Sequence, residues 1–378
     1  MDTLSIDKMY MSRCLELALN GQGNVAPNPM VGALIVHNNR IIGEGYHVKY
    51  GDIHAEIAAI NSVKDKSLLK EATLYLSLEP CSHFGKTPPC TDAIIAMEIP
   101  RVIIATMDVN PKVMGRGIEI LRKAGREVIV GVMEEEARDL NRRFFTFQTK
   151  RRPYIILKWA QTLDGFIDAN RTSADPVAPI WITNELSRSL VHRWRSEEQA
   201  ILIGTKTVEK DNPKLNVRDW SGRTPTRVII DRKLRLPIDS NVFDGCIPTL
   251  LFIGNNAAAL VRKSEFAAIP NLEIISIDFA KGMETQLLKE LYDRNINSVM
   301  IEGGAIIINS FVQKNLWDEA RVFIGNQFFY DGVKAPSFAR ELYSYDELGD
   351  SKLFTYRNKN VVELPKEIAS EPNPDVSI

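Results

Sequence analysis

The segments HAEIAAI (residues 54–60) and LEPCSHFGKTPPC (residues 78–90) bring a histidine, a glutamate and two cysteines into one short stretch of chain. The apolar residues after His54 predict a helix that begins there, and the apolar run at 73–78 predicts a strand that ends just before Cys81. A further helix is predicted directly after Cys90. The polar residues therefore stand at helix starts and beyond a strand end.

The same alternation of helix and strand extends on both sides of these segments. Helices are predicted at 7–20, 54–64, 91–97, 116–124 and 134–149, and strands at 73–78, 101–106 and 127–132, with two more strands within 31–45. Strands that alternate with helices of this length predict a sheet covered by helices. The basic, proline-ended stretch KRRP (150–153) is the predicted boundary, so that residues 1–150 form the first domain.

A second α/β pattern fills residues 151–378. Strands are predicted at 154–161, 200–204, 226–231, 249–253, 297–302 and 320–325, and helices at 184–196, 284–294 and 305–314. The length of 378 residues allows two or three domains, and the pattern favours two. The tail from about residue 366, which holds Pro and Ser, is predicted to be frayed.

Composition narrows the class of protein. Hydrophobic residues make up 44% and charged residues 25%, as in an ordinary globular protein, and the formal net charge of -1 argues against a broad surface for nucleic acid or anionic membrane. No apolar run long enough for a membrane span and no secretion signal are found. Four scattered cysteines predict no disulfide framework, so a cytoplasmic location is expected.

His54, Cys81 and Cys90 suit a tetrahedral zinc ion with one open position. An open position is the catalytic arrangement, because zinc lowers the pKa of a bound water towards ~7. Glu56 follows His54 by two residues, so on a helix it points away from the ligand direction but can reach such a water as a general acid and base. The residues predict a catalytic zinc site.

One histidine and two cysteines alone are more often buried structural residues than ligands. The H-x-E triplet and the Pro80–Cys81 dipeptide change this, because H-x-E and P-C-x-x-C mark the zinc nucleobase deaminases. Here the eight residues SHFGKTPP separate the cysteines instead of two, and they add His83 and Lys86 beside the metal. A cation there fits a phosphorylated or otherwise anionic substrate, whereas elsewhere such a loop would be read as solvated surface.

Together with PNPMVG (27–32) and MDVNPKVMGRG (107–117), these motifs closely resemble the deaminase half of the bifunctional deaminase/reductase family of riboflavin biosynthesis. The resemblance covers about residues 7–145 and implies a cytidine-deaminase-like α/β/α fold. It implies one zinc ion on His54, Cys81 and Cys90, proton transfer by Glu56, and deamination at C2 of 2,5-diamino-6-ribosylamino-4(3H)-pyrimidinone 5′-phosphate. By the same resemblance, the substrate pocket is lined by Asn28, His47, His83, Lys86 and Asn110. Val109 departs from the proline usual in the family.

The second half is less informative by itself. In IEGG (301–304) a strand is followed by two glycines and a helix, which fits a phosphate-binding turn or a turn that simply needs glycine. The segment GTKTVEKDNPKL (204–215) is expected to be a binding loop at the carboxyl edge of a sheet. No G-x-G-x-x-G is present, so a Rossmann site has no support. Arg195 and Arg218 could clamp a phosphate, although isolated arginines are more often solvated.

The order and spacing of KWAQTLDG (158–165), WIT (181–183), the segment 200–218, RVIID (227–231) and IEGG resemble the reductase half of the same family. This implies a dihydrofolate-reductase-like α/β fold, NADPH as cofactor, and reduction of the ring-opened ribosyl group to ribityl. The substrate residues implied are Lys158, near the reacting end, Arg195, Leu215, Arg218 and Glu302. The cofactor residues implied are Gln161, Trp181, Thr207, Asp211, Arg232, Gly304, Ala305, Ile306, Ile307, Ile308, Asn309 and Ser310.

The departures from the family are larger in this half. Phe166 replaces a lysine, NRTSADPVAPI (170–180) replaces a shorter Gly-Asp-Ser stretch, Pro179 takes the place of a serine, and Asn216 that of a threonine. An active reductase with a remodelled pocket rim is expected. Two alternatives remain: a deaminase whose second domain serves only for oligomerisation, and a cytidine or tRNA deaminase. The resemblance also implies a homo-oligomer, a dimer or tetramer, that acts on a small molecule and on no nucleic acid or membrane.

Overall fold

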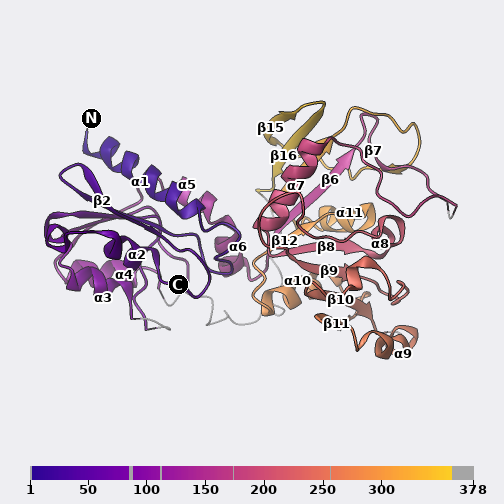
Figure 1. The fold of residues 1–378 in the computed structure, drawn as a ribbon, viewed down its shortest axis with the longest axis horizontal. Helices are drawn as coiled ribbons and strands as arrows, with labels where there is room; N and C mark the ends of the chain where they lie inside the picture. Colours follow the sequence, from indigo (N-terminus) through magenta and orange to yellow (C-terminus); the bar gives the residue numbers. More distant parts are fainter. Residues whose placement is uncertain (1, 85–87, 111–112, 173, 256, 360–378) are drawn as a thin grey trace. The chain divides into compact units, whose positions relative to one another are not determined.

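The computed structural model of the chain describes residues 2–84, 88–110, 113–172, 174–255 and 257–359 (Figure 1). The chain forms two compact units that divide between Lys150 and Arg151, here called unit 1 and unit 2. The tail expected to fray from residue 366 lies outside the described residues. Within them, no helix combines the length and the apolar character that a membrane crossing requires.

Unit 1 is a five-stranded sheet with helices on both faces. Its strands are β1 (Gly32–His37), β2 (Arg40–Tyr46), β3 (Thr73–Leu76), β4 (Arg101–Ile104) and β5 (Glu127–Val130), in the order β2-β1-β3-β4-β5. Its α-helices are α1 (Thr3–Leu19), α2 (Ala55–Ser62), α3 (Cys90–Ala96), α4 (Arg116–Lys123), α5 (Glu134–Leu140) and α6 (Arg142–Lys150). A short 3-10 helix, η1 (Lys66–Glu71), precedes β3.

Two clusters of apolar side chains, one on each face, stabilise this sheet. Residues of α2, α3 and α4 pack in one core with one face of the strands, and residues of α1 and α5 pack against the other face (Figure 1). The strand β1 runs antiparallel to β2 and β3, whereas β3, β4 and β5 are parallel. The carboxyl ends of β3 and β4 therefore lie at one edge, and the segments that follow them meet there through a bond from the Glu79 N–H to the Thr106 carbonyl at 3.0 Å.

Two helix predictions in unit 1 were wrong in their bounds. The first helix begins at Thr3 rather than at residue 7, because the Asp2 side chain caps it by accepting from the Ser5 N–H at 2.8 Å. The helix expected at 134–149 is two helices that meet at Asn141. The Asn141 side chain accepts from the Met30 N–H and donates to the Met30 carbonyl, both at 2.8 Å. The residue between the two helices therefore fixes the backbone of Met30, two residues after Asn28.

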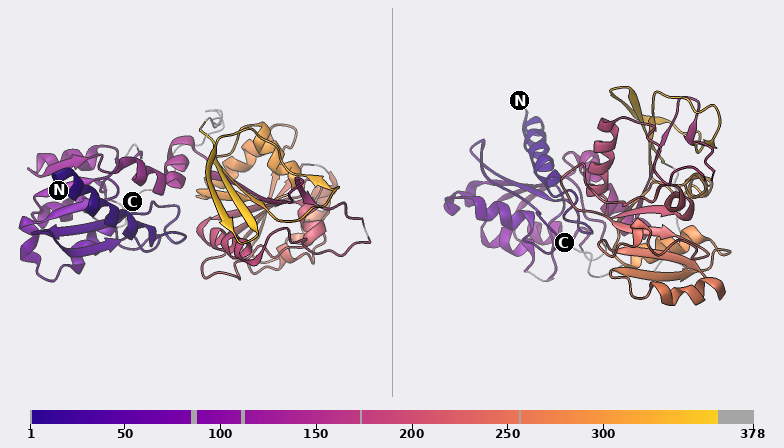
Figure 2. Two further views of the ribbon diagram at one scale, coloured as in Figure 1. Left: turned by 90° about the horizontal axis from the view of Figure 1, so that it is seen from above. Right: turned by 45° about the vertical axis from the view of Figure 1, so that its right-hand side comes forward.

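Unit 2 contains a nine-stranded sheet in the order β11-β10-β9-β8-β12-β6-β13-β16-β15. Its strands are β6 (Tyr154–Gln161), β8 (Ala200–Gly204), β9 (Thr226–Ile230), β10 (Thr249–Gly254), β11 (Leu272–Ile277), β12 (Ser298–Ile301), β13 (Glu319–Ile324), β15 (Leu342–Leu348) and β16 (Ser351–Arg357). A separate two-stranded sheet pairs β7 (Phe166–Asp168) with β14 (Val333–Lys334). The strands from β11 to β13 are parallel, and the antiparallel hairpin β15–β16 extends the sheet beyond β13 (Figure 2, yellow).

The helices of unit 2 cover both faces of this sheet. They are α7 (Glu185–Glu197), α8 (Thr205–Asp211), α9 (Ala257–Phe266), α10 (Met283–Asp293) and α11 (Ala305–Gln313), with a 3-10 helix η2 (Asn241–Phe243). Residues of α10 and α11 share one core with alternate strand residues, and residues of α7, α8 and α9 pack against the others. This leaves the carboxyl ends of the parallel strands as the open edge of the sheet.

Sequence reasoning missed several elements of unit 2. The segment 204–215, expected to be a loop, contains α8, which ends at Asn212 in the left-handed region at φ 39°. The strands β7, β14, β15 and β16 were not predicted, nor were α9 and β11. The hairpin strand β15, LYSYDEL, carries charged residues and is mostly exposed, so it lacks the apolar run that identified the central strands.

Candidate active sites in the two units

The predicted metal ligands of unit 1 lie together. His54 is the N-cap of α2, Cys90 is the first residue of α3, and Cys81 follows β3. His54 Nδ1 lies 3.2 Å from Cys90 Sγ and 3.6 Å from Cys81 Sγ, and the three ligand atoms are all within 4.8 Å of one another. This donor set fits one tetrahedral zinc ion with a position left for water.

The electrostatics of the cluster agree with metal binding. Hydrogen bonds with Cys90 and with His54 lower the pKa of Cys81 to about 4, although burial by itself acts to raise it. The Cys90 N–H also donates to Cys81 Sγ at 3.2 Å, as expected at a helix start. A thiolate at Cys81 is therefore favoured before any metal arrives.

Glu56 lies in the first turn of α2 and is almost completely buried, with 1% exposure. Burial raises its pKa to about 7. Its Oε2 atom has no hydrogen-bond partner among the described residues. A buried carboxyl oxygen without a partner, next to three metal-type donors, is what a proton carrier for a metal-bound water requires.

Asn28 and His47 lie on the same side of the metal cluster. Asn28 Nδ2 is 3.4 Å from His47 Nε2, and the His47 ring stands edge-on to the His54 ring at 6.0 Å. His47 Nδ1 is 3.2 Å from the Ile53 carbonyl, to which it donates, so Nε2 is an acceptor in the neutral ring. Burial lowers the pKa of His47 and keeps that ring neutral. Asn28 Oδ1, buried and without a partner among the described residues, remains available for a ligand.

Sequence reasoning missed Glu79, which shapes the pocket without facing it. Its carboxylate is buried and accepts hydrogen bonds from the backbone N–H groups of Asp108 (3.2 Å), Gly115 (3.0 Å), Gly117 (3.0 Å) and Ile118 (3.3 Å). A Cβ at Gly117 would lie 2.4 Å from the Pro80 carbonyl oxygen, so only glycine fits there. The residue lies in the quoted motif, but its partners are backbone groups that carry no sequence signal.

The remaining predicted residues of this pocket are only partly placed. Asn110 is buried in the segment that Glu79 holds, and its N–H donates to Asp108 Oδ1 at 2.7 Å. His83 is half-buried two residues after Cys81. Lys86 lies outside the described residues.

Unit 2 has a cavity of about 650 Å³ at the carboxyl ends of its parallel strands. Its walls come from the end of β6, from β7 and the segment after it, from residues 179–183, from α8, from the segment after β9, and from the segment between β12 and α11 with the start of α11. The predicted residues that line it are Lys158, Trp181, Thr207, Asp211, Arg232, Glu302, Gly304, Ala305, Ile306, Ile307 and Ile308. The others, Gln161, Arg195, Leu215, Arg218, Asn309 and Ser310, lie outside its lining.

Arg195, Glu302 and Lys158 form a buried charged triad, and two of them, Lys158 and Glu302, line this cavity. Arg195 donates through Nε and Nη2 to the two oxygens of Glu302 at 2.8 and 2.7 Å, and Lys158 Nζ lies 4.0 Å from the same carboxylate. Burial acts to raise the pKa of Glu302, but the charges of Arg195 and Lys158 lower it to about 2. Burial also lowers the pKa of Lys158. The triad thus keeps the Glu302 carboxylate ionised beside the cavity.

The glycines of the IEGG motif allow close approach between β12 and α8. A Cβ at Gly303 would lie 2.9 Å from Thr207 Oγ1, and Gly304 is the N-cap of α11. Gly304 to Ile308 line the cavity, so the N-terminal end of α11 lies at it. A helix start of this kind suits the phosphate groups of a dinucleotide.

Arg171, in the segment that departs from the family, is a rim residue that sequence reasoning missed. Its Nη2 donates to Asp168 at 2.8 Å and to Asp211 at 2.7 Å, and its Nη1 donates to the carbonyls of Ala178 and Lys210. Asp211, expected to face NADPH, thus also anchors the rim segment to α8. The altered composition of 170–180 identified this region as different from the family, but it did not indicate that Arg171 holds the segment in place.

The predicted residues outside the cavity have other contacts. Gln161 accepts from Trp159 Nε1 at 2.9 Å, and Leu215 is buried in the core. Arg218 is partly exposed and its Nη1 lies 3.3 Å from Asn216 Oδ1. Arg195 reaches the site through Glu302, so the structure does not bring the two arginines to one wall of the cavity.

Two family models match the chain, one in each unit. The cytidine and deoxycytidylate deaminase zinc-binding region matches residues 4–106. The RibD C-terminal domain matches residues 153–333. The first match contains His54, Glu56, Cys81 and Cys90, and the second contains the whole set of residues that line the cavity.

Whole-length relatives are similar over both units. Riboflavin biosynthesis protein RibD of Aquifex aeolicus is 43% identical over 331 residues, which cover 87% of this chain and 89% of that protein. RibD of Escherichia coli is 36% identical over 335 residues, with 84% and 87% covered. The crystal structure of a diaminohydroxyphosphoribosylaminopyrimidine deaminase/5-amino-6-(5-phosphoribosylamino)uracil reductase from Thermotoga maritima is similar with a TM-score of 0.83 and 37% identity, covering 94% of this chain and 99% of that one.

Proposed function

The chain belongs to the RibD family of riboflavin biosynthesis proteins, and from this premise we propose the steps that its two units catalyse. It is a bifunctional enzyme, a zinc-dependent deaminase and an NADPH-dependent reductase. Unit 1 deaminates 2,5-diamino-6-ribosylamino-4(3H)-pyrimidinone 5′-phosphate, and unit 2 then reduces the ribosyl group to ribityl. The observation that carries the proposal is one chain with both a His-Cys-Cys cluster beside a free buried carboxyl oxygen and a cavity floored by Lys158 and Glu302.

In unit 1, His54, Cys81 and Cys90 hold the zinc ion, which when bound supplies an activated water molecule. Glu56 would hold a proton at its free Oε2 and deliver it to the amino group on C2 of the pyrimidine. The new C–O bond forms as the C–N bond breaks, and ammonia leaves. Asn28 and His47 orient the ring from the side, because Asn28 Oδ1 is an unused acceptor directed by its contact with His47.

In unit 2, NADPH supplies the hydride when it is bound. The helix start at Gly304 and the neighbouring side chains of Thr207 and Arg232 bind the cofactor along the cavity. Lys158 and Glu302 face the reacting end of the sugar, where C1′ gains the hydride and the neighbouring nitrogen gains a proton. Arg195 keeps Glu302 ionised and oriented through two hydrogen bonds.

A coupled assay on the diaminopyrimidinone phosphate tests this function. Ammonia release without NADPH, followed by loss of 340-nm absorbance when NADPH is added, is the expected result. Ammonia release without any NADPH oxidation would instead support the alternative of a deaminase whose second unit serves only for oligomerisation. The buried triad and the cavity favour the two-step enzyme.

The other alternative is a deaminase that acts on cytidine or on a tRNA base. The Cys81–Cys90 spacing and the near-neutral net charge weigh against it. We expect no ammonia release from cytidine or from RNA under conditions in which the phosphorylated pyrimidine is consumed. Turnover of cytidine at a comparable rate would replace the proposed substrate.

Two further properties belong to the same proposal. A reducing compartment such as the cytoplasm would keep Cys81 and Cys90 available as metal ligands. A homo-oligomer, dimer or tetramer, is proposed from the family relationship, and sedimentation of the purified protein tests it.

A further inference from the structure

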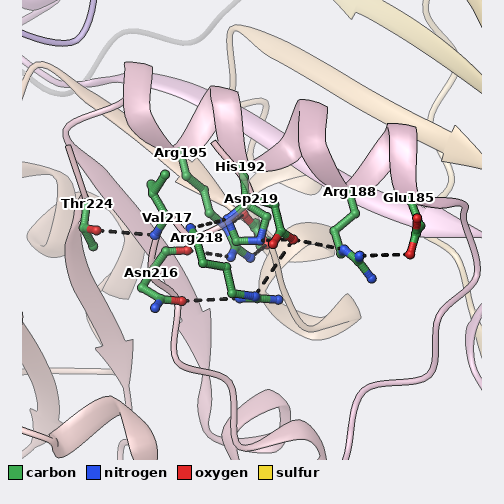
Figure 3. A network of polar contacts seen from close by, with 10 residues as sticks. Glu185, Arg188, His192, Arg195, Asn216, Val217, Arg218, Asp219 and Thr224 are labelled. Atoms are coloured by element: carbon green, nitrogen blue, oxygen red, sulfur yellow. Dashed lines mark hydrogen bonds and ion pairs between the residues drawn. The ribbon is translucent and has the colours of Figure 1, made fainter. Parts of the chain in front are cut away.

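His192 is a buried histidine of α7 with a defined place in a polar network (Figure 3). Its Nδ1 accepts a hydrogen bond from the Arg218 N–H at 3.3 Å, and its Nε2 lies 3.5 Å from Asp219 Oδ2. Because Nδ1 accepts, the proton of the neutral ring is on Nε2, which faces the carboxylate. The ring therefore holds two consecutive residues of one segment, each through a different nitrogen.

Three residues of α7, spaced along one face of the helix, hold the segment that contains Arg218. Arg188 Nε donates to Asp219 Oδ2 at 3.0 Å, and Arg195 Nη1 donates to the Asn216 carbonyl at 3.3 Å. His192 lies between the two arginines, at spacings of four and three residues, so the three side chains point to the same side. The segment 216–219 is thus held at three points (Figure 3).

A neutral imidazole is well suited to the central point of this network. Burial, together with the charges of Arg195 and Arg218, lowers the pKa of His192 to about 4. The ring stays neutral near pH ~7 and offers one acceptor and one donor on opposite sides. Arg218 keeps its guanidinium partly exposed, with its Nε 3.9 Å from Asp219 Oδ2. Its direction therefore depends on where His192 and Asp219 hold the backbone.

We propose that His192 is a positioning residue of the reductase, which fixes the Arg218–Asp219 segment so that the Arg218 guanidinium meets the phosphate of the pyrimidine substrate. This rests on the proposed function, together with the contact between Arg218 and the substrate that the family resemblance implies. His192 is 1% exposed and is therefore not placed to touch the substrate or NADPH, whereas the Arg218 side chain is 44% exposed. Its loss acts on substrate binding through Arg218 and leaves the cofactor site and unit 1 as they are.

The test compares His192→Phe, His192→Asn, Arg218→Ala and the double variant His192→Phe/Arg218→Ala in the full-length enzyme. Phe keeps the ring volume without polar atoms, and Asn keeps an acceptor near the position of Nδ1. We expect His192→Phe to raise the KM for the deaminated phosphorylated substrate about tenfold, since the Arg218 N–H and Asp219 lose a buried partner. The KM for NADPH and the deaminase rate stay unchanged, and His192→Asn regains most of the loss.

The double variant separates positioning from general destabilisation. If His192 acts through Arg218, adding His192→Phe to Arg218→Ala raises the KM no further. Additive effects, or an equal rise in the KM for NADPH, would overturn the proposal. If Arg218→Ala alone leaves the substrate KM unchanged, the phosphate contact in the proposed function is wrong and the inference falls with it. Leu186→Ala, on the exposed face of the same helix, is the matched control and should resemble the wild type.

Discussion

The two sites hold their key buried carboxylates in opposite ways. Glu79 of unit 1 accepts hydrogen bonds from four backbone N–H groups of the segment 108–118. Glu302 of unit 2 is held by the guanidinium of Arg195 and the ammonium of Lys158, which come from distant parts of the chain. The first arrangement fixes the course of the backbone, and the second pairs a buried carboxylate with two buried basic side chains.

This difference predicts different responses to mutation. A carboxylate held by backbone groups should matter through the position of the loop, and its loss should leave the surrounding charges unchanged. A carboxylate held by buried cations should matter through charge, because its loss leaves the cations without compensation. The variants below test this contrast, and each has the other unit's activity as an internal control.

The largest effect is expected for Glu56→Ala. Without its proton carrier the deaminase rate should fall by roughly 10²- to 10⁴-fold, because no other described side chain is placed to replace the free Oε2. Zinc content should stay near about one ion per chain, since Glu56 is not among the three ligands. Metal analysis and ammonia release measure both. Full residual deaminase activity would contradict the assigned role.

Next comes Glu302→Gln, which leaves Arg195 and Lys158 without their anion. The reductase kcat/KM should fall about a hundredfold, and unit 2 should lose roughly 3 kcal/mol of stability, as for other broken buried pairs. NADPH oxidation and thermal unfolding measure these changes. A variant with normal unfolding and normal reductase activity would show that the triad has neither role.

Lowering the pH should bring the wild type closer to this variant. Burial acts to raise the pKa of Glu302, but Arg195 and Lys158 lower it from 4.5 to about 2. The ionised carboxylate therefore stabilises unit 2 fully above pH 4.5, and that contribution is lost as the pH falls towards 2. The difference in melting temperature between wild type and Glu302→Gln should shrink as the pH falls from about 4.5 towards about 2. A constant difference would exclude an electrostatic origin.

A smaller effect is expected for Glu79→Ala. Four backbone N–H groups lose their acceptor, so the segment that contains Asn110 should shift and the deaminase rate should fall roughly tenfold. Because its partners are uncharged, Glu79→Gln should recover part of the rate, in contrast to Glu302→Gln. Zinc content, measured in parallel, should not change. Equal losses for the two Glu79 variants would mean that charge dominates in unit 1 as well.

The smallest effect is expected for Arg171→Ala at the rim of the unit 2 cavity. Its bonds to Asp168, Asp211 and two carbonyls hold the rim segment, but both carboxylates remain partly exposed. We expect the KM for NADPH to rise about threefold, because a partly solvated ion pair contributes only a small free energy. Val177→Ala, exposed in the same segment, is the control. No change in KM would mean that the segment is held by other contacts.

The same contrast explains how much could be predicted from the sequence. His54, Glu56 and Cys90 stand at helix starts and Cys81 follows a strand, all within one short stretch, so spacing and residue type were enough to place them together. Glu79 was missed because a residue that binds only backbone leaves no partner to find in the sequence. The break at Asn141 was missed for the same reason, since its partners are the backbone groups of Met30.

In unit 2 the central strands were predicted from their apolar runs, and the cavity at their carboxyl ends followed from the α/β pattern. The pairing of Arg195 with Glu302 could not be predicted, because it depends on how α7 packs against β12 across a long interval of sequence. Arg171 belongs to an inserted segment whose conformation is set by its own ion pairs. The edge hairpin β15–β16 is polar and exposed, so its strands depend on pairing with β13.

The four backbone bonds of Glu79 have a consequence for how the deaminase pocket can diverge. Because these bonds reach only backbone N–H groups, an exposed side chain of the segment such as Met114 can be exchanged while the bonds to Glu79 are kept. Gly115 and Gly117 are exceptions, since Gly115 has a φ of 75° and the Pro80 carbonyl leaves no room for a Cβ at Gly117. Exposed side chains of this segment can thus vary, under selection or by design, and alter substrate preference while the backbone bonds that hold the segment beside the metal site stay the same.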